Sequence, residues 1–257
     1  MADNRIAYGM LKQAGINTEG MSPTEAWKKL NELKDVAAKK GYAVAHKVDF
    51  TANNVVSLNA YVDTLRKLFK QYNIGKIKSI STLDVIENNP DILGARSSNG
   101  IILKNSILDN PEEHYIEYVE NFQSGITKSI AISQSELNRT PASDVANMNT
   151  LQAEISSYRK MQPYSRNNVC YKDSVVECAA VHEFAHELFD HLDDGKKEVI
   201  KNRFDMLKNT SFLKKISYYA STNHQDFFAE IFVLKTMNKE PVHKVVSDIF
   251  SELGVQI

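Results

Sequence analysis

The sequence predicts an α+β fold, mainly because of the order in which its helical and strand-like patterns follow each other. A helical start over residues 1–44 is followed by strand-like stretches up to residue 133, by one strong helix after residue 174, and then by more helix. The chain has 257 residues, of which 42% are apolar and 25% charged. It can therefore bury a core in one medium domain, with or without a small accessory unit.

The first 45 residues predict a small helical unit. Residues 4–14 have helical spacing and end at Gly15. Ser22-Pro23-Thr24-Glu25 combines a capping box with proline at the first helical position, so a second helix is expected up to Gly41. Two such helices have too little apolar surface to be a convincing domain alone. We therefore expect residues 1–45 to be an accessory or docking unit for a protein partner, and residues 46–257 to be the main domain.

The strand-like stretches lie between residues 42 and 133. Four are expected to be strands: residues 42–50, 76–80, 99–104 and 125–133. The last of them is expected because Ile126, Ile130 and Ile132 alternate. An amphipathic helix is expected over residues 55–72, and a polar helix or a long loop over residues 140–158.

The strongest pattern in the chain is an H-E-x-x-H motif, His182-Glu183-Phe184-Ala185-His186, inside a helical stretch. Two histidines four residues apart lie one above the other on a helix, so their ring nitrogens can close on one metal ion. Glu183, one step round the helix, can reach a water at that ion. The helix is expected to begin at a capping box at Ser174 and to end at Gly195. The motif therefore predicts a zinc site with His182 and His186 as ligands.

Two nearby residues are less suited to bind this metal ion. Cys178 lies one turn before His182, but the ion should lie between the two histidines, so a small buried apolar role is favoured. His191 falls on the opposite flank of the helix. Cys170 and Cys178 are the chain's two cysteines, too few for a disulfide scaffold, which indicates a reducing environment.

Charge and hydropathy indicate which classes of binding partner and which cellular location to expect. The formal net charge is −1, so no nucleic-acid partner and no anionic membrane surface is expected. The first residues lack a hydrophobic leader, and no apolar run approaches the length of a membrane span. We expect a cytoplasmic protein, or one delivered by a route independent of a signal peptide.

A zinc site with two histidines needs a third protein ligand, and the segment from Tyr218 to Phe232 offers one. Thr222 or Asn223 can cap a helix there, and Asp226 and Glu230 fall on one face of it among apolar residues. Buried carboxylates are costly unless they are paired or bound to a metal. One carboxylate is therefore expected to bind the metal and the other to orient a histidine. The alternative is an ion pair with a lysine such as Lys235.

The two motifs together, His182 to His186 and then Tyr219-Ala220-x5-Asp226-Phe227-Phe228-Ala229-Glu230-x-Phe232, resemble a known family. It is the zincin catalytic domain of anthrax lethal factor, with related metallopeptidase domains of phage and mobile-element proteins. The resemblance covers about residues 46–257. Residues 99–104 also resemble the strand at the substrate-side edge of that family's sheet.

The resemblance implies a role for each site residue: His182, His186 and Asp226 as zinc ligands, Glu183 as the general base, and Tyr219 as the hydroxyl donor to the oxyanion. This chain has Asp226 where the family usually has Glu. Glu230 is therefore either a residue that supports the ligands from behind or the alternative third ligand. Tyr218 competes with Tyr219 for its role.

The function that follows is that of a zinc-dependent endopeptidase, in which Glu183 activates the water that attacks a protein or peptide substrate. Such a protein could be an effector that its N-terminal helices bring to a partner. One alternative is a regulatory metallopeptidase that cleaves a repressor, although residues 1–44 show no clear DNA-recognition helix. Another is a zinc-binding interaction module that has lost its catalytic activity.

Overall fold

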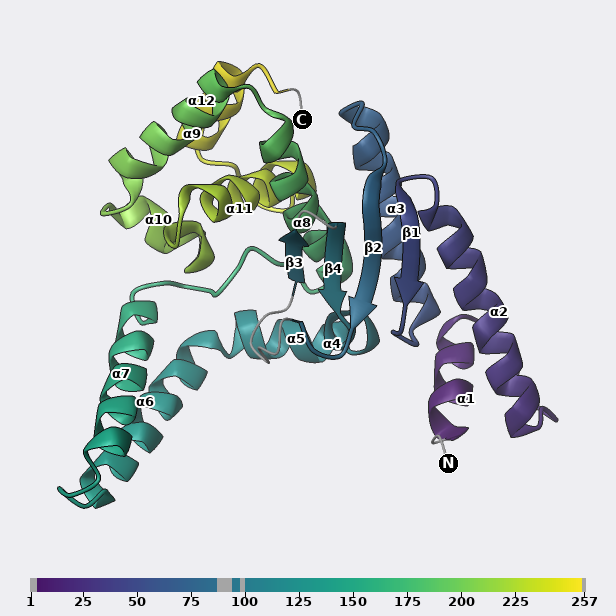
Figure 1. The fold of residues 1–257 in the computed structure, drawn as a ribbon, viewed down its shortest axis with the longest axis horizontal. Helices are drawn as coiled ribbons and strands as arrows, with labels where there is room; N and C mark the ends of the chain where they lie inside the picture. Colours follow the sequence, from purple (N-terminus) through teal and green to yellow (C-terminus); the bar gives the residue numbers. More distant parts are fainter. Residues whose placement is uncertain (1–3, 87–93, 98–99, 256–257) are drawn as a thin grey trace. The chain divides into compact units, whose positions relative to one another are not determined.

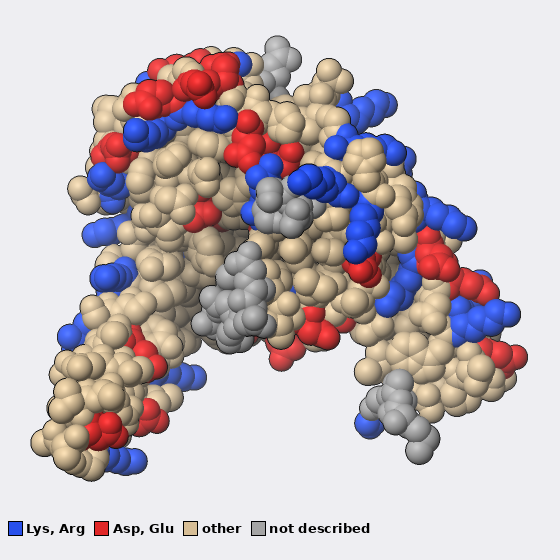
Figure 2. Space-filling view, viewed as in Figure 1, with Lys and Arg blue, Asp and Glu red and all other residues tan. Residues whose placement is uncertain are grey.

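The computed structural model describes residues 4–86, 94–97 and 100–255 and shows a mixed α+β chain that is mostly helical (Figure 1). It divides into two compact units: unit 1 comprises Met1–Glu112 and Lys172–His191, and unit 2 comprises Glu113–Tyr171 and Leu192–Ile257. The expected α+β class is confirmed. On the face drawn in Figure 2, basic and acidic side chains are interspersed, in line with the near-zero net charge. Among the described residues, no helix is long and apolar enough to cross a membrane.

Unit 1 contains a four-stranded mixed sheet, in the order β1-β2-β4-β3 (Figure 1). The strands are β1 (Ala45–Phe50), β2 (Ile77–Leu83), β3 (Gly94–Ser97) and β4 (Gly100–Lys104). β1 and β4 each pair parallel with β2, and β3 pairs antiparallel with β4. The strands expected over residues 42–50, 76–80 and 99–104 are therefore present, although Asn99 lies outside the described residues.

The expectation that residues 99–104 form an edge strand is wrong. β4 has a hydrogen-bonded neighbour on each side, and β3 is the strand at that end of the sheet. β4 approaches β2 closely at Gly100, whose φ is +136° and whose missing Cβ would lie 1.9 Å from the Ser79 carbonyl oxygen. Only glycine fits there, because a side chain would collide with the backbone of β2.

Among the described residues of unit 1, five helices accompany the sheet: α1 (Asn4–Gln13), α2 (Pro23–Gly41), α3 (Val55–Gln71), α4 (Asn105–Asp109) and α8 (Val175–His191). Ser22 caps α2 with the expected capping box to Glu25. Ala7 and Leu11 of α1, together with Leu30 of α2, share a buried cluster with Val55 of α3. Residues 4–45 thus pack into unit 1, and the docking role expected for residues 1–45 remains a prediction.

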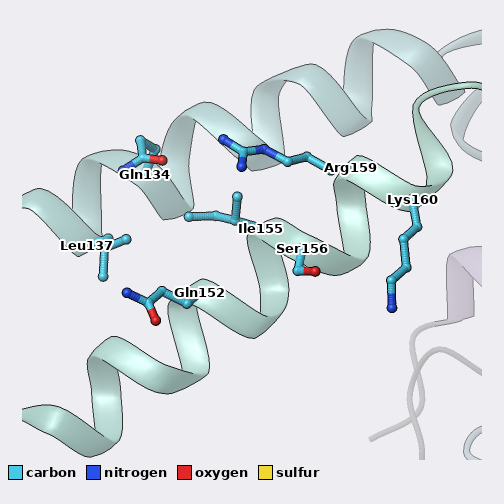
Figure 3. A pocket seen from close by; sticks show the side chains of 7 residues that line it. All are labelled: Gln134, Leu137, Gln152, Ile155, Ser156, Arg159 and Lys160. Carbon is cyan, nitrogen blue, oxygen red and sulfur yellow. The ribbon is translucent and has the colours of Figure 1, made fainter.

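Unit 2 is helical. It begins within α5 (Pro111–Tyr115) and continues with a π-helix (Ile116–Glu120), α6 (Phe122–Arg139), α7 (Val145–Met161), α9 (Asp194–Leu207), α10 (Ser211–Ile216), a short 3-10 helix (Tyr219–Ser221), α11 (His224–Met237) and α12 (Lys244–Leu253). α6 and α7 pack against each other, and Figure 3 shows a pocket lined by residues of both. The stretch expected to be either a polar helix or a long loop is therefore helix α7.

Two expectations about this part of the chain are wrong. The strand expected over residues 125–133 lies inside helix α6, where Phe122, Ile126 and Ser133 are buried at helical spacing while Ile132 is exposed. Gly195 does not end the metal-motif helix, because α8 stops at His191 and Gly195 lies in the first turn of α9. Asp193 starts α9 by accepting a hydrogen bond from the Lys196 backbone N–H at 2.9 Å.

Candidate metal centre

Helix α8 carries the H-E-x-x-H motif, and its apolar stripe fixes how the helix is rotated. Phe184 is completely buried, and its ring centroid lies 5.2 Å from that of Phe69 and 5.6 Å from that of Tyr72, at the C-terminal end of α3. Because α3 and α8 pack together through these rings, the two histidines lie at the border of the stripe, where both are partly exposed.

The ring nitrogens of the two histidines converge. The Nε2 atoms of His182 and His186 lie 3.2 Å apart, and the ring planes are inclined at 74°. Two nitrogens that bind one zinc ion tetrahedrally, at about 2.0–2.1 Å each, are separated by roughly 3.3 Å. Burial, with smaller contributions from His182 and Arg96, lowers the pKa of His186 from 6.5 to about 3. The ring is therefore neutral at physiological pH, as a metal ligand must be.

Glu183 lies in the core of unit 1, with a relative exposure of 6%. Its carboxylate sits beside Gly94 of β3, where a Cβ would lie 2.3 Å from Oε1. Burial raises the pKa of the completely buried Tyr61 hydroxyl in α3 well above its usual value, and the charge of Glu183 raises it further. The Glu183 side chain is thus enclosed by packed structure, which restricts the positions that its carboxylate can adopt.

One turn further along α8, Glu187 forms an ion-pair network that sequence analysis missed. The Arg96 side chain donates from Nε to Glu187 Oε2 at 3.0 Å and lies 2.5 Å from Asp190 Oδ2 through its terminal nitrogen. His191 Nδ1 lies 2.9 Å from the Glu187 carbonyl oxygen. The i, i+4 spacing of Glu183 and Glu187 is visible in the sequence, but Arg96 is 91 residues away along the chain.

Cys170 and Cys178 are both buried, and the relative exposure of Cys178 is 2%. This agrees with the expected small apolar role of Cys178. His191 contacts Glu187, on the flank of α8 where the sequence places it.

The acidic residues of the second motif lie on α11 in unit 2. Asn223 caps this helix by accepting hydrogen bonds from the backbone N–H groups of Gln225 and Asp226, each at 2.9 Å. The Asp226 carboxylate accepts hydrogen bonds from Thr222 Oγ1 at 2.5 Å and Asn223 Nδ2 at 2.6 Å. Its side chain is partly exposed. The first turn of α11 therefore presents an oriented carboxylate with an accessible side.

Glu230, one turn later, is completely buried. Its Oε2 accepts hydrogen bonds from the Val169 backbone N–H at 2.5 Å and from Ser217 Oγ at 2.7 Å. Ser217 Oγ in turn accepts from the Ala220 backbone N–H at 3.0 Å. Through Ser217, Glu230 thus stabilises the start of the short 3-10 helix that contains Tyr219.

The two adjacent tyrosines have different surroundings. The Tyr218 ring packs edge-on against Tyr164, with ring centroids 5.4 Å apart. The Tyr219 backbone N–H donates to the Asn167 carbonyl oxygen at 2.9 Å, which fixes the position of its main chain. Both side chains are partly exposed.

His182, His186 and Asp226 form a group that could hold a metal ion. Imidazole and carboxylate donors suit zinc and other first-row divalent ions, so the donor set alone does not select the metal. Comparisons of the chain with protein-family models, with curated proteins and with solved structures find no match.

Proposed function

We propose that this chain is a zinc-dependent endopeptidase of the zincin class, similar in its catalytic domain to anthrax lethal factor. The observation that supports this best lies on one helix. The Nε2 atoms of His182 and His186 lie 3.2 Å apart. Glu183, which follows His182 directly in the sequence, is buried. A metal site that only stabilises a fold needs two such nitrogens but no buried carboxylate of this kind.

His182, His186 and Asp226 are the proposed zinc ligands. Asp226 suits this role because hydrogen bonds from Thr222 and Asn223 hold its carboxylate, while the side chain remains partly exposed. Glu230 suits it less, because Val169 and Ser217 already bind one of its oxygens in the core of unit 2. We therefore assign Glu230 to holding the segment that carries Tyr219.

A zinc ion held there would lower the pKa of a water molecule towards about 7 and polarise the scissile carbonyl. Glu183 accepts a proton from the attacking water and then passes it to the leaving amine. Tyr219 donates its hydroxyl hydrogen to the oxyanion that develops on the carbonyl. Tyr218 is the weaker candidate for this role, because its ring packs against Tyr164.

The experiment combines zinc analysis with a peptide-library cleavage assay on freshly purified protein that has not met a chelator. We expect one zinc per chain and cleavage of a subset of peptides. Glu183→Gln should keep the zinc and lose cleavage, because the carboxylate is the base rather than a ligand. Glu177→Gln, in the first turn of the same helix, is the matched control and should keep both.

Three results would distinguish the remaining possibilities. Absence of stoichiometric zinc would overturn the metal assignment. Cleavage that persists in Glu183→Gln would overturn the role of that residue. Stoichiometric zinc in a protein that cleaves no peptide would favour the zinc-binding interaction module instead. Residues 1–45 remain the proposed docking segment for a protein partner.

A further inference from the structure

Two residues on one face of strand β3 contact two residues on one face of helix α8. Successive side chains of a strand point to opposite faces, so Gly94 and Arg96 share one face of β3. Residues four apart on a helix also share a face, so Glu183 and Glu187 lie together on α8. β3 packs against α8, with Gly94 beside Glu183 and Arg96 beside Glu187.

At the first position, the absence of a side chain makes room for the carboxylate. A Cβ on Gly94 would lie 2.3 Å from Glu183 Oε1 and 2.9 Å from its Cδ, distances that real Cβ atoms essentially never show. Gly94 is not among the glycines with positive φ, so its backbone conformation does not itself require glycine. The main constraint at this position is the space that Glu183 occupies, and Leu103 Cδ2, at 3.0 Å from such a Cβ, is the next neighbour.

At the second position, charge holds the strand on the helix. Glu187 has a relative exposure of only 4%, and a buried carboxylate is costly unless it is paired. Arg96 supplies the pair at 3.0 Å and also reaches Asp190 on the exposed flank of α8. A guanidinium bound by two carboxylates on one helix fixes the register of β3 along that helix.

We propose that Gly94 and Arg96 are positioning residues for Glu183. Arg96 anchors β3 to α8, so that the backbone at Gly94 lies over the carboxylate and keeps it in one position. This inference rests on the proposed peptidase function, since it assigns the two residues a purpose in that reaction. Neither residue has to touch the substrate or the metal for this role.

The kinetic test uses Gly94→Ala in the zinc-loaded protein. A displacement of about 1 Å at a reacting group can lower the rate about a hundredfold, so kcat should fall by roughly that factor. KM should stay within about threefold, and zinc content should not change, because no ligand is touched. Arg96→Ala should also lower kcat, and Arg96→Lys should recover only part of it because lysine cannot reproduce the planar fork. Unchanged kcat in Gly94→Ala would overturn the proposal.

A second measurement does not depend on activity. Gly94→Ala should lower the urea midpoint of unfolding, and the loss should shrink by at least half in a Glu183→Ala background, where the carboxylate is gone. Gly125→Ala is the matched control, because a Cβ there meets nothing within 4 Å. If Gly94→Ala alone does not fold, Glu183→Ala should restore folding. An equal loss in both backgrounds, or no restored folding, would overturn the contact.

The kinetic and urea measurements distinguish failure of the proposed peptidase function from failure of the positioning role. A zinc-loaded wild-type protein that cleaves no peptide defeats the proposed function, whereas the urea experiment still decides whether Gly94 makes room for Glu183. An active wild-type protein whose Gly94→Ala variant is equally active defeats only the positioning role.

Discussion

The Nε2 atoms of His182 and His186 lie 3.2 Å apart on adjacent turns of α8. A hydrogen bond between the two rings would use one nitrogen as donor and the other as acceptor, and it would persist without metal. Binding of a metal instead requires a free lone pair on both nitrogens. The two possibilities differ in how much the protein depends on zinc, and this difference can be measured.

Replacing His182 with Ala should remove the bound zinc and lower the melting temperature. Binding to the folded state alone at a hundred times Kd contributes about 2.7 kcal/mol, which corresponds to about 5–10 °C in a chain of this size. Metal analysis and thermal unfolding with and without chelator provide the test. His46→Ala, at an exposed position of β1, should change neither quantity. A chelator that leaves the wild-type melting temperature unchanged would contradict the metal site.

Asp226 and Glu230 should differ when their side chains are removed. Asp226→Ala should lose zinc to chelator concentrations that leave Glu230→Ala loaded, because a direct ligand contributes more than a residue behind it. Glu230→Ala should instead lower the free energy of unfolding by about 1–3 kcal/mol, because it removes the acceptor for the buried Val169 N–H and for Ser217. Chelator titration and urea unfolding separate the two effects. The opposite order of zinc loss would move the ligand assignment to Glu230.

Local signals were sufficient for much of the fold. The capping box at Ser22 and the periodicity of residues 55–72 predict α2 and α3, because short-range geometry determines both. Ile126, Ile130 and Ile132 predict a strand, but the burial of Ile126 and the exposure of Ile132 show that helical packing determines this segment. Gly195 likewise predicts a helix end, whereas the Asp193 cap places it in the first turn of α9.

The candidate site also contains residues that the sequence predicts and residues that only the fold brings together. His182, Glu183 and His186 could be predicted because their spacing on a helix is a local property. The contacts that Gly94 and Arg96 make with α8 could not, because 91 residues separate Arg96 from Glu187 and only the fold brings them together. The short strand β3 has no alternating apolar pattern that would have marked it beforehand.

Tyr219→Phe should keep zinc and slow peptide cleavage by about ten- to a thousandfold, the range typical of one lost donor to an oxyanion. Tyr218→Phe is the matched control one residue away, and it should leave cleavage nearly unchanged because its ring keeps its contact with Tyr164. Initial rates and zinc content of both variants provide the measurement. A larger loss in Tyr218→Phe would exchange the two assignments.

His114 of α5 is a buried titratable group away from the H-E-x-x-H motif in the sequence. It has a relative exposure of 7%, and its ring stacks on Tyr118 with centroids 4.7 Å apart. Burial lowers its pKa from 6.5 to about 4. The folded protein therefore resists protonation of this ring, whereas the unfolded chain accepts a proton at an ordinary pH.

The sign of the effect on stability follows from that difference. Above pH 6.5 the ring is neutral in both states, so its contribution is fully present; as the pH falls from 6.5 towards about 4, the unfolded state binds a proton first and stability is lost. The total should be about 3 kcal/mol, at 1.36 kcal/mol for each unit of pKa. Urea unfolding of wild type and His114→Phe between pH 7 and pH 4 measures it, because all other groups cancel in the comparison. Phe keeps the aromatic stack on Tyr118, so the variant should lose less stability than wild type over this range. Parallel curves for the two proteins would show that His114 titrates normally.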